Sequence, residues 1–471
     1  MISPNPETWT VTSLSKALRK KEISPVEITH KYLERINAHD SQINSFITLL
    51  PQEALRAARQ AEKEIAKGKY RGPLHGIPFA AKDLFFTKGI RTTCGSKILK
   101  NFVPAYHATV IERLLAAGAI LLGKLNMHEF AYGTTSVNPH YGPVRNPWDR
   151  ERVTGGSSGG SAAALASSFV PLTLGTDTGG SIRIPSALCG TAGLKPTYGR
   201  ISRYGVYPLC WSLDHPGPMA RSVADLAMAM NVLAGLDPLD ASTSAVAVPD
   251  YARGLSNNLK GIRAGIPDTF YFDRLEPEVR AAVRKAIWVF KGLGAAVKKV
   301  SIPHLPEASV AAFIILLAEG AASLEKWHRT RPMDLGDDVR SRLNLGAAVT
   351  AAQYLKAQTI RRRIRETFSR VFQQVDVILA PQLPITAPKL NQGSVSWGKK
   401  TEAVPSALTR FTRIYNLVGI PSLSLPCGFS SSGLPIGLQI AGKPFDEAMV
   451  LKVGHAYELN TPWKARHPAL D

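Results

Sequence analysis

Residues 155–183 read GGSSGGSAAALASSFVPLTLGTDTGGSIR, and this stretch has the composition of a loop, a helix, a strand and a second loop in succession. A run of glycine and serine at 155–161 leads straight into the alanine-rich segment 162–167, whose composition favours a helix. The apolar run at 170–174 then has the length of a short buried strand, and the glycine-rich residues 175–183 follow it. Polar side chains and glycine residues therefore stand directly beside apolar runs that should be buried.

The same alternation continues along the chain. Strand-like apolar runs are predicted at residues 77–81, 119–122, 377–380, 422–425 and 436–440. A helix is predicted from 109 to 117 with a stop at Gly118, and residues 280–375 have mainly helical patterns. Short buried strands that alternate with helices are typical of a layered sheet, so the predicted fold class is α/β.

The first 70 residues are predicted to be a helical lead-in. The tetrapeptide Ser-Pro-Val-Glu at 24–27 has the spacing of a capping box, with proline at the first helical position. A second helix is predicted from Gln52 to a stop at Gly68. The main α/β domain is then expected over residues 71–471. It should form one structural unit with residues 1–70, because no repeat or linker divides the chain.

The composition is that of a globular protein with an unusual charge. Of the 471 residues, 45% are hydrophobic and 20% are charged, which excludes wholesale disorder and a collagen-like fibre. The 57 Lys and Arg residues against 36 Asp and Glu residues give a net charge of +21, which favours contact with polyanions. The densest basic cluster, RRRIR at 361–365, has no interleaved aromatics. We interpret it as an exposed helix face and expect no nucleic-acid partner.

Cysteine usage and hydropathy indicate a cytoplasmic protein. The four cysteines are Cys94, Cys189, Cys210 and Cys427. Their wide spacing predicts buried thiols in a reducing compartment. Residues 128–132 (HEFAY) begin like the zinc motif H-E-x-x-H, but tyrosine replaces the second histidine, so no metal is expected. The polar segment 1–12 does not resemble a signal peptide. Apolar stretches such as 114–123 are shorter than the ~18 residues that span a bilayer, so no membrane partner is expected.

A lysine ends the apolar strand predicted at 77–81. Lys82 must either reach water or lie desolvated against partners. Desolvation disfavours the ammonium form and lowers the lysine pKa towards that of a base usable at neutral pH. Taken alone, a strand-end lysine that reaches water is the commoner case.

The segment 155–161 fits several kinds of site. A flexible linker is disfavoured because a helix follows at once, and a Walker-type phosphate loop is disfavoured because serine stands where lysine is needed. The pattern G-x-S-x-G at 155–159 matches the nucleophile elbow of α/β-hydrolases, but polar residues 148–154 precede it where a buried strand is required. A histidine such as His215 or His455 could serve as the partner of that serine.

The glycine-rich segment after the strand predicted at 170–174 has the composition of an oxyanion hole. The tetrapeptide Thr-Gly-Gly-Ser at 178–181 places backbone N–H groups without bulky side chains beside a serine. A nucleophile needs such donors where negative charge develops on its substrate. A plain glycine turn is the alternative interpretation.

Together these segments resemble the amidase signature family of hydrolases, which use a Ser-cisSer-Lys triad. The resemblance rests on GIPFAAKD at 76–83, GGSSGGS at 155–161 and GTDTGGSIR at 175–183. Ser157 follows Lys82 by 75 residues and precedes Ser181 by 24, as that family's triad requires. Further matches cover nearly the whole chain: GLKPTYGR at 193–200, SLDHPGP at 212–218, NLVGIP at 416–421, PCG at 426–428 and GLPIGLQ at 433–439.

The resemblance implies a single α/β/α domain with a twisted mixed β-sheet covered by helices, in which residues 71–471 are the catalytic domain. It implies three catalytic residues: Ser181 as nucleophile, Ser157 as bridging serine on a cis peptide, and Lys82 as neutral base. The implied oxyanion hole consists of the backbone N–H groups of Thr178, Gly179, Gly180 and Ser181. The implied supporting residues are Asp177, Arg183 and Ser158. No cofactor is implied.

Within that family we favour a free-standing amidase that cleaves a hydrophobic carboxylic amide through an acyl-enzyme. Esters and carbamates (urethanes) are chemically close substrates for the same serine. The expected partner is therefore a small-molecule substrate, with a homodimer as the expected assembly. A less polar pocket would be lined by Met127, Tyr132 and Phe313.

The alternative is the glutaminase subunit of the tRNA-dependent amidotransferase, which belongs to the same family. That subunit typically has DEFAMG where residues 128–133 read HEFAYG, and it holds the α-amino group of glutamine with an aspartate where Thr409 stands. Arg342 matches its carboxylate-binding arginine, so one of the two charges of glutamine would be met. A third interpretation, a basic nucleic-acid-binding protein with a degenerate site, is disfavoured by the intact triad.

Overall fold

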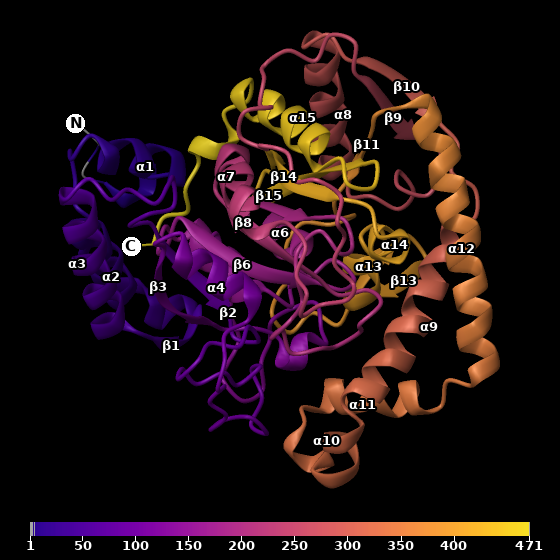
Figure 1. Cartoon of the computed structure of the whole chain (residues 1–471). Coiled ribbons are helices and arrows are strands. Elements are labelled where there is room, and N and C mark those ends of the chain that lie inside the picture. The colour runs from indigo at the N-terminus through magenta and orange to yellow at the C-terminus, as the bar shows by residue number, and fades with distance from the viewer. Residues whose placement is uncertain (1–2, 4, 471) are drawn as a thin grey trace.

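The computed structural model describes residues 3 and 5–470, and Figure 1 shows a large sheet with helices packed around it. The sheet has 11 strands in the order β1-β3-β2-β6-β8-β7-β14-β15-β11-β9-β10. These strands are β1 (Phe46–Leu49), β2 (Pro78–Lys82), β3 (Ile120–Leu125), β6 (Leu172–Asp177), β7 (Ala192–Lys195), β8 (His215–Ala220), β9 (Arg263–Pro267), β10 (Ala296–Val300), β11 (Val377–Pro381), β14 (Ser422–Phe429) and β15 (Pro435–Gly442). Two small sheets pair β4 (Arg145–Asn146) with β5 (Asp149–Val153), and β12 (Ser394–Trp397) with β13 (Lys400–Ala403).

Helices lie between many of these strands. They are α1 (Val11–Arg19), α2 (Pro25–Ile43), α3 (Pro51–Ala66), α4 (Thr109–Ala116), α5 (Gly159–Ala166), α6 (Arg183–Cys189), α7 (Val223–Leu233), α8 (Pro277–Gly292), α9 (Leu305–Ser323), α10 (Glu325–Thr330), α11 (Asp337–Ala347), α12 (Ala351–Gln374), α13 (Val404–Thr409), α14 (Arg413–Val418) and α15 (Glu447–Leu459). Short 3-10 helices lie at Pro6–Thr8, Glu129–Ala131, Pro332–Asp334 and Trp463–Ala465.

The large sheet is mixed and lies inside the molecule. β2 pairs in parallel with β3 and β6, and β9 pairs in parallel with β10 and β11. The strands between β6 and β11 pair antiparallel. Helices α5, α6, α7, α8 and α15 pack against these strands and bury their apolar residues. The predicted α/β class, with a mixed sheet covered by helices, is confirmed.

β8 is a strand that the sequence patterns did not reveal. Its sequence, HPGPMA, contains Pro216 and Pro218, and proline normally argues against a central strand because it has no N–H to donate. In the structure β8 pairs with β6 along its whole length, but with β7 only at Met219 and Ala220. One side of its first half therefore lacks a partner strand, and the prolines are tolerated there.

Most of residues 5–70 lie in helices, and one strand interrupts them. The predicted start of α2 is confirmed: Ser24 Oγ accepts the Glu27 N–H at 3.1 Å, and the Ser24 N–H donates to Glu27 Oε2 at 2.7 Å. The unpredicted strand β1 pairs antiparallel with β3, so this segment supplies an edge of the main sheet. The division of the chain at residue 70 stays a prediction.

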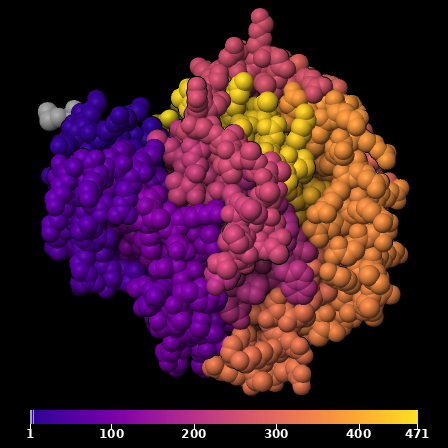
Figure 2. Space-filling model, viewed as in Figure 1, coloured from indigo at the N-terminus to yellow at the C-terminus, as the bar shows by residue number. Residues whose placement is uncertain are grey.

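The region predicted to be mainly helical contains α8 to α12, interrupted by the edge strand β10. Figure 1 shows α9 and α12 running side by side beyond the end of the sheet, with α10 and α11 at their far end. Figure 2 shows that this orange region forms one flank of the molecular surface.

Helix α9 corrects the expectation that the apolar stretches are all short. Its 19 residues are long and apolar enough to cross a membrane by length and composition alone, with a mean hydropathy of 1.6. In the structure α9 packs against α11, α12 and α14, and it buries residues such as Ile315 and Glu319. The helix is therefore partly buried, with 44% of its apolar window inside the protein.

The basic cluster at 361–365 is only partly an exposed face, which corrects that prediction. Arg361 is buried, and its guanidinium donates to the carbonyl oxygens of Leu417 and Ser212 at 2.8 Å each. Arg365 donates to Val418 O at 3.2 Å. These two arginines satisfy carbonyl groups at the end of α14, where an unpaired backbone acceptor would otherwise be left.

Candidate active site

Lys82 lies at the end of β2, between two neighbouring strands. β2 is flanked by β3 and β6, so the lysine side chain is fully buried. Its Nζ donates to Ser157 Oγ at 2.7 Å and to Thr176 Oγ1 at 2.8 Å. The lysine therefore does not reach water, and its two hydroxyl partners come from the segments that the sequence analysis singled out.

The environment of Lys82 makes it a usable base. Burial lowers its pKa to about 7, although the carboxylates of Asp214 and Asp177 act in the opposite direction. A lysine with a pKa near 7 is about half neutral at neutral pH, whereas an ordinary lysine is almost wholly charged. A neutral amine can accept a proton from a hydroxyl group.

Ser157 is held in a tight loop that leads into α5. The Gly156–Ser157 peptide bond is cis. The glycines that follow are required by close packing: a Cβ on Gly159 would lie 2.4 Å from Ser136 Oγ, and one on Gly160 would lie 2.3 Å from Asn126 O. The loop follows β5, which pairs with β4 outside the main sheet. The nucleophile-elbow interpretation, which needs a buried strand of the main sheet here, is therefore wrong.

Ser158 connects the Ser157 loop to Ser181. Its backbone N–H donates to Ser181 O at 3.2 Å, and its Oγ donates to Thr176 O at 3.2 Å. Ser181 itself is 6% exposed and borders a cavity. Within the described residues, the hydroxyl groups of Ser157 and Ser181 do not hydrogen-bond to each other. The structure thus brings Lys82 and Ser157 into direct contact and holds Ser181 beside them through Ser158.

Asp177 holds the loop that was expected to form the oxyanion hole. Its carboxylate accepts the N–H groups of Gly180 at 2.8 Å, Ile182 at 3.2 Å and Arg183 at 3.3 Å. Gly180 is therefore a correction to the predicted hole, because its N–H already has an acceptor. The N–H groups of Thr178, Gly179 and Ser181 have no acceptor among the residues that the structure describes.

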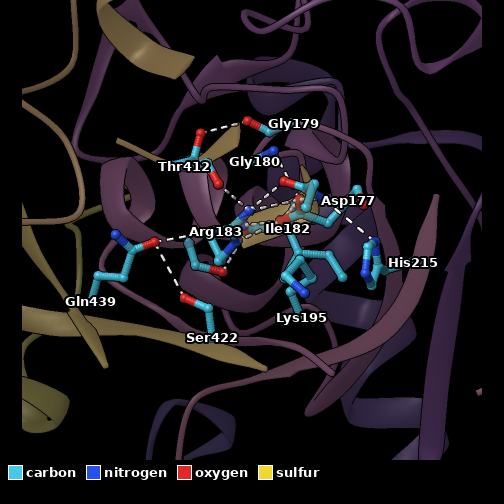
Figure 3. Close-up of polar contacts among 12 residues, drawn as sticks. Asp177, Gly179, Gly180, Ile182, Arg183, Lys195, His215, Thr412, Ser422 and Gln439 are labelled. Atoms are coloured by element: carbon cyan, nitrogen blue, oxygen red, sulfur yellow. Dashed lines mark hydrogen bonds and ion pairs between the residues drawn. The ribbon is translucent and has the colours of Figure 1, made fainter. Parts of the chain in front are cut away.

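Arg183 anchors the same loop from the other side (Figure 3). It donates to both carboxylate oxygens of Asp177 at 2.9 and 3.0 Å, and also to Gln439 and Asn416 at 2.9 and 2.8 Å. Burial alone would raise the pKa of Asp177, but the charge and hydrogen bonds of Arg183 hold it well below its usual value. This buried pair keeps the 177–181 loop in one conformation.

A cavity of about 180 Å³ opens at Ser181. Three of the four residues predicted for the substrate pocket line it, namely Tyr132, Phe313 and Arg342. Met127 does not; it is fully buried in the core. Thr409 also lines the cavity, and so does Arg413, which the sequence analysis missed. The cavity combines apolar walls with two guanidinium groups, so it is less apolar than predicted.

His215, considered above as a partner for a serine, and His128, considered as the start of a zinc motif, make other contacts. His215 is buried, and its Nδ1 lies 2.5 Å from Leu213 O. Burial and the charge of Lys195 hold its pKa well below its ordinary value. His128 Nε2 contacts Asp338 Oδ2 at 2.7 Å. No group of three or more His, Cys, Asp or Glu residues in the described chain could hold a metal ion.

The family model for amidases matches residues 27–451. The chain belongs to the amidase signature family. It is 46% identical over 485 residues to the A-subunit of the glutamyl-tRNA(Gln) amidotransferase of Chloroflexus aurantiacus, with 98% of each chain covered.

Solved amidase-type structures share the fold. A structure from a vestigial protein complex connected with the origins of an s-triazine catabolic enzyme is 37% identical, covers 96% of this chain and 98% of its own, and has a TM-score of 0.92. A bacterial aryl acylamidase of the amidase signature family is 28% identical, with 97% of each chain covered and a TM-score of 0.89. These similarities confirm the family resemblance inferred from the motifs.

Proposed function

We propose that this protein is a serine hydrolase that cleaves the C–N bond of a carboxylic amide, with Ser181 as its nucleophile. The observation that carries the proposal is the hydrogen bond from a fully buried Lys82 to Ser157 Oγ, beside a cavity that Ser181 borders. A serine hydroxyl needs a base before it can attack a carbonyl carbon, and a desolvated lysine is such a base.

In the proposed reaction, Ser181 Oγ attacks the amide carbon while its proton passes to Ser157 and the Ser157 proton passes to neutral Lys82. A rotation of a serine side chain would close this relay. The oxyanion accepts hydrogen bonds from N–H groups among those of Thr178, Gly179 and Ser181. The C–N bond then breaks, the nitrogen takes the proton back from Lys82 through Ser157, and the amine or ammonia leaves. Water attacks the acyl-enzyme by the same route and releases the carboxylic acid.

The proposal is tested with Ser181→Ala and a matched control. Ser406 lines the same cavity, so Ser406→Ala removes a hydroxyl group from the pocket without touching the relay. Amide hydrolysis should disappear in Ser181→Ala and persist in Ser406→Ala. Esters and carbamates belong in the same assay, because they react through the same acyl-enzyme. Equal activity of Ser181→Ala and the unmodified protein would refute the proposal.

A second candidate function is that of a glutaminase subunit in a tRNA-dependent amidotransferase. It is favoured by the 46% identity to an amidotransferase A-subunit over 98% of the chain, and the curated relatives support it better than they support a free-standing hydrophobic amidase. The cavity argues for a different substrate, because Thr409 stands where an aspartate would meet the α-amino group of glutamine. Glutamine hydrolysis that appears only with the partner subunits and tRNA would establish this second function.

A further inference from the structure

The two cationic side chains that line the cavity differ in how their charges are met. Arg342 donates to Asp338 Oδ2 at 2.8 Å and to Tyr132 O at 2.8 Å. Its charge therefore has a counter-charge within the protein. Among the described residues that line the cavity, none is acidic.

Arg413 has no such counter-charge. Its guanidinium carbon lies 5.3 Å from the centre of the Phe313 ring, and a Cβ added to Gly179, in the loop that carries Ser181, would lie 3.8 Å from the Arg413 Cβ. Across residues 3 and 5–470, no ion pair or hydrogen bond to the Arg413 guanidinium is present. The stacked ring holds the side chain in place but supplies no formal negative charge.

Among the described residues, Glu402 is the one carboxylate that influences the pKa of Arg413, and it already forms ion pairs with other arginines. Glu402 Oε2 lies 3.3 Å from Arg410 Nη2 and 3.8 Å from Arg274 Nη1, and it accepts the Trp397 indole N–H at 3.1 Å. Burial lowers the pKa of Arg413 to about 10, while Glu402 acts in the opposite direction. Arg413 therefore stays charged at neutral pH, while the Glu402 carboxylate is paired with Arg274 and Arg410.

Arg413 is half-buried, and a half-buried charge without a partner favours a ligand of opposite charge. A guanidinium group presents a planar fork of N–H donors that matches a carboxylate. We infer that Arg413 binds a carboxylate group of the substrate, so that the substrate class is an amide that also carries a carboxylate. This inference rests on the proposed amidase function and makes Arg413 a specificity-determining residue.

The same geometry disfavours a zwitterionic substrate such as glutamine. An ammonium group next to the carboxylate would enter a cavity with two guanidinium groups and no acidic lining residue. The expected order of substrates is therefore a carboxylate-bearing amide first, with its neutral counterpart and its α-amino counterpart both poorer.

The test uses matched amides that differ in one group. Malonamate, succinamate and glutaramate (5-amino-5-oxopentanoate) are each compared with the neutral amide of the same chain length: propanamide, butanamide and pentanamide. Glutamine is compared with glutaramate, from which it differs by the α-amino group. For at least one chain length, the full-length protein should favour the carboxylate-bearing amide about 10- to 100-fold in kcat/KM, mainly through KM, as expected for a charged hydrogen bond.

The variants then assign that preference to Arg413. Arg413→Met should abolish the preference while keeping hydrolysis of the neutral amide, and Arg413→Lys should restore part of it. Arg363→Met, on the exposed face of α12, controls for the change in net charge. Equal rates for charged and neutral amides, a preference for glutamine over glutaramate, or an unchanged preference in Arg413→Met would overturn the inference.

Direct binding separates this inference from the proposed function. Glutarate, succinate and malonate are titrated calorimetrically into the unmodified protein and into Arg413→Met. Binding of at least one diacid that falls about 10-fold or more in Arg413→Met supports the anion site even if no amide is hydrolysed, in which case only the proposed function fails. Absence of diacid binding together with hydrolysis of neutral amides would refute the anion site and leave the hydrolase proposal standing.

Discussion

Lys82 Nζ lies 2.7 Å from Ser157 Oγ, and both side chains are fully buried. The lysine lies at the end of β2, and the serine lies 75 positions later in the loop before α5. The second hydroxyl partner of the lysine, Thr176, belongs to β6, which pairs directly with β2. The adjacency of these two strands therefore places the lysine beside the glycine-rich segments.

The pH dependence of activity should follow the titration of Lys82. Its pKa is lowered to about 7 by burial, so the neutral form is lost as pH falls through that value. Activity should rise about 10-fold per pH unit on the acid side and level off above pH 8. Lys82→Met should lose this acid limb of the pH–rate profile together with most of the rate. A rate profile of Lys82→Met that keeps the acid limb would mean that another group is the base.

The Asp177–Arg183 pair should contribute strongly to stability. Asp177→Asn leaves the buried Arg183 guanidinium without its counter-charge and should lower the free energy of unfolding by about 3–5 kcal/mol. The exposed pair of Arg329 and Glu325 gives a matched control, because Glu325→Gln should cost less than about 1 kcal/mol. Urea denaturation of both variants measures the difference. Equal losses of unfolding free energy in the two variants would show that the buried ion pair contributes no more to stability than the exposed one.

Gly180 should not accept a side chain. Its φ is +134°, and a Cβ there would lie 2.4 Å from Thr412 Oγ1. Gly180→Ala should therefore shift the 177–181 loop and remove most of the activity. Gly433 also has a positive φ, but a Cβ there would meet no atom within 4 Å. Gly433→Ala should cost about 1 kcal/mol of stability and leave kcat/KM unchanged. Full activity of Gly180→Ala would contradict this account of the loop.

Thr409→Asp should change substrate preference towards glutamine. The new carboxylate would stand in the cavity beside Arg413, where it could pair with an α-amino group and compete with the substrate carboxylate. The ratio of kcat/KM for glutaramate to that for glutamine should fall about 10- to 100-fold. Thr409→Asn, which has the same shape without the charge, should leave the ratio near its original value. An unchanged ratio in Thr409→Asp would argue against a role for this position in selectivity.

The sequence predicted the parts of the fold that depend on local pattern. The capping box of α2 and the strand that ends at Lys82 were found because caps and apolar runs are read within a few residues. β8 was missed because the two prolines in its sequence are tolerated only through one-sided pairing. That pairing is a property of the sheet and leaves no local signal.

For a related reason, the sequence predicts some residues of the candidate site but not others. Lys82, Ser157 and Ser181 stand in segments with unusual composition, whereas the acceptor for the Gly180 N–H depends on how the loop folds back onto Asp177. Arg413 lies 232 positions after Ser181 and enters the cavity only because α14 packs beside the Gly179 loop. One basic residue in a helical segment carries no signal of that placement.

The most direct test of the central claim is to find which residue becomes acylated. The protein is mixed with an activated ester that acylates faster than it deacylates, quenched in acid, digested and mapped by mass spectrometry. The account predicts a single acyl group on Ser181, absent from Ser181→Ala and retained in Ser406→Ala. An acyl group on Ser157 or on any residue other than Ser181, or an adduct that persists in Ser181→Ala, would contradict it.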